Sequence, residues 1–96
     1  MLLKKPHSEG DVVSVKLTSE IELIARLVRE ESKSVTVSKP MRVVNDMRGG
    51  VGLMDWIMLG DSNEVTIDRS HIYHVSAAIK EFADQYTEST TGIALR

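Results

Sequence analysis

The sequence predicts an all-β domain: a small, strongly bent, five-stranded antiparallel barrel with a short C-terminal helix. Three observations lead to this class. Short segments of alternating apolar and polar residues come first along the chain, glycine and proline separate or bend them, and one segment of helical periodicity comes last. A length of 96 residues is enough for one small domain.

The first strand is predicted within DVVSVKLT, residues 11–18. Its apolar side chains, Val13, Val15 and Leu17, alternate with polar ones, which is the period of two of a half-buried strand. Residues 1–10 before it are expected to form a flexible N-terminal arm in which His7 is solvated.

The next run, TSEIELIARLVREESKSVTVSKP, is ambiguous in its first half. As a helix, it would begin with a capping box at Ser19 and Glu22 and would place Ile21, Ile24, Leu27 and Val28 on one face. As a strand, it would place Ile21, Leu23, Ala25 and Leu27 on one face and Glu22, Ile24, Arg26 and Val28 on the other. Local propensity favours the helix, whereas the short TSE turn and the β-like SVTVSKP that follows favour the strand.

The middle of the chain predicts two further strands around a loop. Val35 and Val37 alternate with polar residues, and Pro40 marks a bend or an edge because it cannot donate a ladder hydrogen bond. NDMRGGVG, residues 45–52, is a loop rich in turn formers. LMDWIML, residues 53–59, then predicts a strand that is apolar on both faces, and in so short a chain we expect another subunit to cover one of them.

The last part of the chain predicts two short strands and the helix. EVTID is a strand, RSH a tight link and IYHV the last strand. Ser76 is expected to cap a helix whose apolar face holds Ile79, Phe82, Ala83 and Tyr86, with Lys80 pairing with Asp84. The domain is thus predicted to span residues 11–87, with a frayed tail over 88–96.

Composition excludes several classes of protein. There is no cysteine, no signal peptide pattern and no apolar run of membrane-spanning length, so a cytoplasmic protein without membrane contact is expected. The net charge of −2 is too acidic for a general nucleic-acid coat. Residues 26–54 nevertheless carry six basic and three acidic side chains, a local +3 that suits either a solvated strand surface or an anion site.

No pattern of catalytic residues is visible. The chain has no glycine-rich phosphate loop, no nucleophile elbow and no paired carboxylates, so neither an enzyme nor a cofactor is expected. Asp68, His71 and His74 do not match the spacing of a metal site, because strand geometry puts the two histidines on opposite faces.

Two stretches resemble the motifs of Sm-like (LSm) domains. VSVKLTSEIELIARLV is similar to the first Sm motif, and EVTIDRSHIYHV is similar to the second, two short strands joined by a polar link. The resemblance implies a strongly bent five-stranded barrel, and it favours the strand for residues 21–30. Three departures are clear: Glu20 and Ala25 stand where the family usually has glycine, Val35 replaces the Asn of the base-gripping loop, and DRSH replaces Arg-Gly-Asn.

The resemblance also implies an assembly and a ligand. Family rings form when one strand pairs with the next subunit, which here implies a homo-oligomer interface of Met54, Trp56, Met58, Ile72, Tyr73 and Val75. The pore loops would carry Lys33, Arg69, Ser70 and His71 and would bind single-stranded RNA. The alternative is an Sm-like scaffold ring that binds a protein partner and no nucleic acid. Trp56 could instead be core beneath the C-terminal helix.

Overall fold

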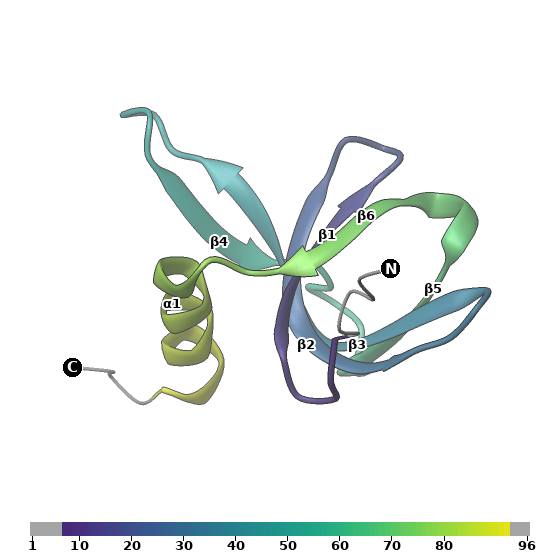
Figure 1. Ribbon diagram of the computed structural model, residues 1–96. Helices are drawn as coiled ribbons and strands as arrows, with labels where there is room; N and C mark the ends of the chain where they lie inside the picture. Colours follow the sequence, from purple (N-terminus) through teal and green to yellow (C-terminus); the bar gives the residue numbers. More distant parts are fainter. Residues whose placement is uncertain (1–6, 93–96) are drawn as a thin grey trace, which may run out of the picture.

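The computed structural model describes residues 7–92, which form mostly β-structure and one C-terminal helix (Figure 1). The strands are β1 (Val12–Leu17), β2 (Glu22–Glu30), β3 (Ser34–Asn45), β4 (Val51–Asp55), β5 (Glu64–Asp68) and β6 (Ile72–Ala77). A single 3₁₀ turn, η1 (Arg69–His71), links β5 to β6, and the helix is α1 (Lys80–Thr91). The predicted β-rich class with a C-terminal helix is confirmed, with six strands in place of five. No helix in this part of the chain is long and apolar enough to cross a membrane.

The six strands form one antiparallel sheet in the order β4-β3-β2-β1-β6, with β5 paired to β3 off this path. The long strand β3 therefore changes partner along its length: residues 34–38 pair with β5, and residues 41–45 pair with β4. In Figure 1 the β3–β4 hairpin points away from the curled region that holds β1, β2, β5 and β6. The molecule thus has a curled half and an outlying hairpin.

The ambiguous segment is a strand, as the resemblance predicts, and both of its faces are buried. Leu23, Ala25 and Leu27 pack into the main core inside the curl, whereas Ile24 faces a second cluster on the opposite side. The main core contains Val13, Val15, Leu17, Leu23, Ala25, Leu27, Val35, Val37 and Ile67. Its members come from β1, β2, β3 and β5. Contacts between strands therefore decide between the helix and the strand template, which local propensity alone does not.

A hinge at Lys39 and Pro40 separates the two halves of β3. Lys39 has φ of 48°, and the register between β2 and β3 shifts at Ala25, which lies between the paired residues Ile24 and Arg26. The strand runs through the predicted bend at Pro40 and changes its neighbour there. A bulge of this kind bends and twists a strand, which turns the outer half of β3 away from the curl.

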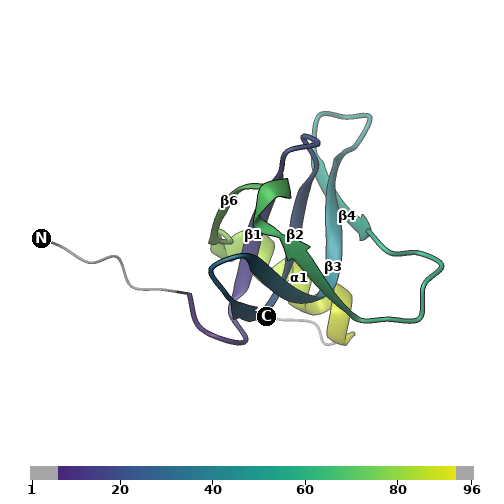
Figure 2. The ribbon, with the colours of Figure 1, turned by 90° about the vertical axis from the view of Figure 1, so that its right-hand side faces the viewer.

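The helix packs on the second cluster, on the face of the sheet opposite the main core. Tyr86 is fully buried there with Ile24 and Met41. Its hydroxyl lies 2.8 Å from the carbonyl oxygen of Lys39, a hinge residue, and 3.1 Å from that of Ser38, the residue before the hinge. Figure 2 shows α1 running behind the sheet. Tyr86 thereby attaches α1 to the hinge.

Two predicted element boundaries are wrong. The helix begins at Lys80 with Ile79 at its N-cap, because Ser76 lies within β6 opposite Ser14. It continues past Thr87 to Thr91 and ends at Gly92, whose φ of 75° suits a glycine cap; residues 93–96 of the predicted tail lie outside the described residues. The expected Lys80–Asp84 pair is present at 2.7 Å.

The predicted strand over residues 53–59 is shifted. β4 starts two residues earlier and ends at Asp55, which pairs with Met41, the first β3 residue after the hinge. Residues 56–63 therefore leave the sheet, because the bend in β3 removes the partner that would extend the ladder. Two backbone hydrogen bonds join the ends of this segment to the hinge: the Trp56 amide donates to the Pro40 carbonyl at 3.3 Å, and the Lys39 amide donates to the Asn63 carbonyl at 2.6 Å.

Residues 7–10 of the predicted arm are attached to β2, whereas residues 1–6 lie outside the described residues. The Gly10 amide donates to the Leu27 carbonyl at 2.7 Å, and the Arg26 guanidinium donates to the Gly10 carbonyl at 2.8 Å. The expectation that His7 is solvated is wrong: its side chain is 18% exposed and contacts Glu30.

Candidate nucleic-acid interface

The loop after β2 and the link after β5 meet, and they bring together the four residues predicted to bind nucleic acid. Lys33 lies in the loop, and Arg69, Ser70 and His71 form η1. The Arg69 amide donates a hydrogen bond to the Lys33 carbonyl at 2.9 Å. The Arg69 Nε atom donates to the Glu31 carbonyl at 3.1 Å. Two backbone carbonyls of the loop after β2 therefore hold Arg69, which belongs to the link after β5.

The link itself is ordered by its N-cap residue. The Asp68 side chain accepts a hydrogen bond from the Ser70 amide at 2.8 Å. This bond from the backbone lowers the pKa of Asp68, and the Ser70 hydroxyl and nearby His71 act in the same direction. The exposed carboxylate is thus ionised at neutral pH, so a negative charge lies next to the cationic residues of the loop junction.

Arg69 is only partly available to a ligand. Its guanidinium Nη2 lies 3.3 Å from the Glu30 carboxylate, and its side chain is 39% exposed. Lys33 is exposed, and no carboxylate within residues 7–92 lies in ion-pair distance of its ammonium group. Ser70 and His71 are exposed as well. The junction therefore offers one open cation per chain and a second that is already paired.

The sequence interpretation missed Glu30 and His7. Glu30 and Glu31 are adjacent carboxylates where β2 ends and the loop begins. In the structure, Glu31 pairs with Arg29 at 3.4 Å, and Glu30 is the residue that contacts Arg69. Neighbouring residues at the end of a strand point to opposite sides, and the register of β2 decides which of them faces the link.

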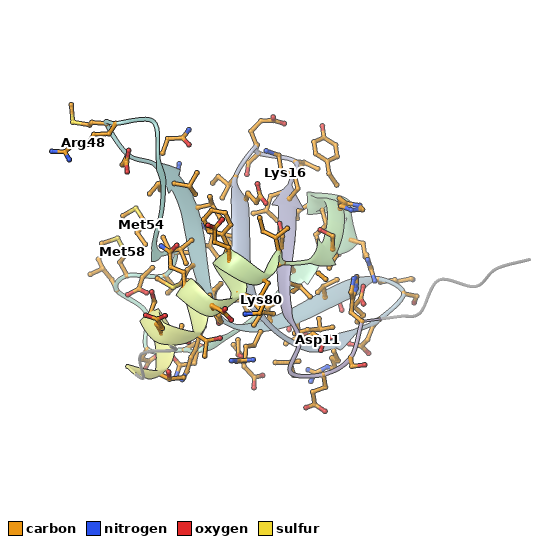
Figure 3. All side chains as sticks on the ribbon, turned by 60° about the vertical axis from the view of Figure 1, so that its left-hand side comes forward. Asp11, Lys16, Arg48, Met54, Met58 and Lys80 are labelled. Carbon is orange, nitrogen blue, oxygen red and sulfur yellow. The ribbon has the colours of Figure 1, made fainter. Side chains whose placement is uncertain are left out.

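The six predicted interface residues do not form one surface in a single chain. Met54, Met58 and Tyr73 are exposed to 41%, 69% and 66%. Trp56, Ile72 and Val75 are partly buried against the main core. Figure 3 shows Met54 and Met58 on the same side of the molecule, with Arg48 at the end of the β3–β4 hairpin.

Trp56 lies at a hollow beside β5. The hollow has a volume of about 400 Å³ and is lined by Trp56, four β5 residues, His71 and the turn between β1 and β2. The alternative that Trp56 is core beneath the helix is wrong, because Trp56 packs on the main core and α1 packs on the second cluster. The sole tryptophan of the chain therefore lies near the outer edge of β5 and near the loop junction.

Within residues 7–92 no group of three or more histidine, aspartate or glutamate side chains is arranged to hold a metal ion. Comparisons with protein-family models and with curated proteins found no match to this sequence.

Proposed function

We propose that this chain is an Sm-like protein that assembles into a ring and binds single-stranded RNA through the 31–33 loop and the 69–71 link. Two backbone features support the resemblance to the family. Glu20, at the position where the family usually has glycine, has φ of 73°, a left-handed conformation that glycine adopts most easily. Ala25, at the other usual glycine, lies at the register shift where β2 bends.

The proposed barrel and ring are supported by the arrangement of strand edges. β5 pairs only with β3, and β6 pairs only with β1, so each leaves one edge without a partner in the described chain. Both strands contribute side chains to a shared core, which supports the proposed barrel. Unpaired edges are templates for pairing with another chain. Head-to-tail pairing of β5 with β6 of the next copy would satisfy both edges, and such a contact can close into a ring.

The observation that carries the RNA proposal is the hydrogen-bonded junction of the two loops. In a closed ring this junction would be repeated once per subunit, so that the exposed Lys33 ammonium forms a ring of cations suited to phosphates. His71, which is also exposed, would add an imidazole for stacking on a base.

A second function is favoured by a different observation. Several large apolar side chains on the hairpin and the segment after it are exposed: Met47, Val51, Met54, Met58 and Leu59. Flexible methionine side chains are common on surfaces that bind proteins. The neutralisation of Arg69 by Glu30 also weakens the case for a phosphate site. The alternative is therefore a scaffold ring that binds a protein partner through the hairpin and binds no RNA.

The first test is the native mass by light scattering at two protein concentrations. A constant mass of several subunits is expected. A monomer at both concentrations would refute the ring and the shared pore with it.

The second test is titration of a fluorescently labelled, single-stranded RNA at two salt concentrations. We expect Lys33→Ala to weaken binding and to reduce the dependence of log K on log salt by roughly 0.7 for each phosphate that the lysine no longer neutralises. Lys80→Ala, which removes a cation from α1 on the opposite face of the sheet, is the matched control. Absence of binding, or equal weakening in both variants, would reject the RNA function and favour the scaffold.

A further inference from the structure

The carboxylate of Glu30 joins the N-terminal arm to the loop junction. Its Oε1 atom lies 3.0 Å from His7 Nδ1, and its Oε2 atom lies 3.3 Å from Arg69 Nη2. The Glu30 side chain is 22% exposed, and that of His7 is 18% exposed. Each carboxylate oxygen therefore has its own partner, in a partly desolvated position where charge pairs are stronger than on an open surface.

Arg69 does not depend on Glu30 for its position. Its amide is held by the Lys33 carbonyl, and its Nε atom by the Glu31 carbonyl. These two hydrogen bonds fix the backbone and one side of the guanidinium, and the Glu30 carboxylate occupies Nη2 on the outer part of the group. Removing that carboxylate would thus expose the donor without releasing the side chain from the loop.

We propose that Glu30 is an internal competitor for the anion site at Arg69 and thereby determines how tightly the junction binds phosphate. A carboxylate and a phosphate use the same donors of a guanidinium, so only one of them can occupy Nη2 at a time. With Glu30 in place, the pair carries no net charge, and an incoming phosphate has to displace the carboxylate. For an RNA ligand this inference rests on the proposed function, but the competition at Arg69 does not.

The chain provides a matched control for the test. Glu31 is adjacent, carries the same charge and has its carboxylate on Arg29, with both side chains more than half exposed. Glu30→Gln and Glu31→Gln change the net charge equally, but only the first replaces the charged acceptor at Nη2 of Arg69 by a neutral amide oxygen, which competes less strongly with phosphate. We expect Glu30→Gln to bind the labelled single-stranded RNA roughly two- to fivefold more tightly than the wild type, with a smaller gain for Glu31→Gln. Adding Arg69→Gln to Glu30→Gln should abolish the extra gain. Equal gains in the two single variants, or a gain that survives Arg69→Gln, would overturn the proposal.

A second measurement tests the competition without RNA. The Nε–H resonance of Arg69 is followed by NMR during titration with inorganic phosphate, in the wild type and in Glu30→Gln. The expected result is a response at lower phosphate concentration in Glu30→Gln, whereas identical responses would overturn the proposal. If no variant binds RNA but the phosphate responses differ, the proposed function fails and the role of Glu30 stands. Circular dichroism and thermal unfolding establish that each variant is folded.

Discussion

The two halves of β3 belong to one strand but lie in different environments. Val35, Thr36 and Val37, in the inner half, are almost fully buried, and this half has a strand on each side. The outer half, paired with β4, has Val43 and Val44 only partly buried. Each half contains two valines, which alternate with polar residues in the inner half and are adjacent in the outer half. Neither arrangement states which half is the more deeply buried. What differs is the covering layer: the curl of the sheet buries the inner half, whereas α1 covers Met41 and leaves Val43 partly exposed in the outer half.

The hinge between the halves is fixed by Tyr86, so its removal should have the largest effect. Tyr86→Ala is expected to lower the free energy of unfolding by about 3–5 kcal/mol, because it empties a fully buried aromatic site and frees two backbone carbonyls. Tyr86→Phe keeps the ring and should cost about 1 kcal/mol. Urea unfolding followed by circular dichroism measures both. A decrease below about 1 kcal/mol for Tyr86→Ala would show that the helix does not stabilise the hinge.

Much of this fold could be predicted where local pattern and tertiary pairing agree. The strict alternation at Val13, Val15 and Leu17 predicted β1, and the buried face of β2 was predicted once its strand template was chosen. The start of the helix was not predicted, because Ser76 has the chemistry of an N-cap but lies opposite Ser14 in the sheet. A backbone already paired with β1 cannot also begin a helix.

The candidate site was predicted only in part. The pattern of two strands with a polar link identified Arg69 and its neighbours, and the structure brings them to Lys33. The pairing of Arg69 with Glu30 could not be predicted, because it depends on which of two adjacent carboxylates faces the link. Similarly, the end of β4 before Trp56 depends on the hinge in its partner strand, which is a property of β3 and not of the β4 sequence.

A pair of identical substitutions compares the two halves directly. Val37→Ala, in the inner half, should lower the free energy of unfolding by about 2 kcal/mol, because two fully buried methyl groups are removed and a cavity remains. Val44→Ala, in the outer half, should cost under about 1 kcal/mol, because this side chain is already partly in water. Denaturant unfolding of both variants gives the difference. Equal decreases would mean that the outer hairpin is buried in solution, as it would be beneath a second subunit. Because such burial depends on protein concentration, the measurement is repeated at two concentrations.

The smallest effect concerns the ionisation of the hinge tyrosine at high pH. Burial raises the pKa of Tyr86, although the nearby Arg26 acts in the opposite direction. The unfolded chain therefore loses the phenolic proton at lower pH, near 10, than the folded protein does. The stability that Tyr86 contributes is fully present below about pH 10 and is lost as pH rises through the folded pKa, with a slope of at most about 1.4 kcal/mol per pH unit.

This pH dependence can be isolated with matched variants. The protein has two tyrosines, and Tyr73 is exposed, so Tyr73→Phe removes the same chemical group away from the hinge. Urea unfolding between pH 8 and about pH 11 should show a steeper loss of stability in the wild type and in Tyr73→Phe than in Tyr86→Phe. Lysine titration is common to all three proteins and cancels in the comparison. The same slope in Tyr86→Phe as in the wild type would contradict the raised pKa of Tyr86. It would mean that the Tyr86 hydroxyl, which donates to the Lys39 carbonyl, ionises as easily in the folded protein as in the unfolded chain.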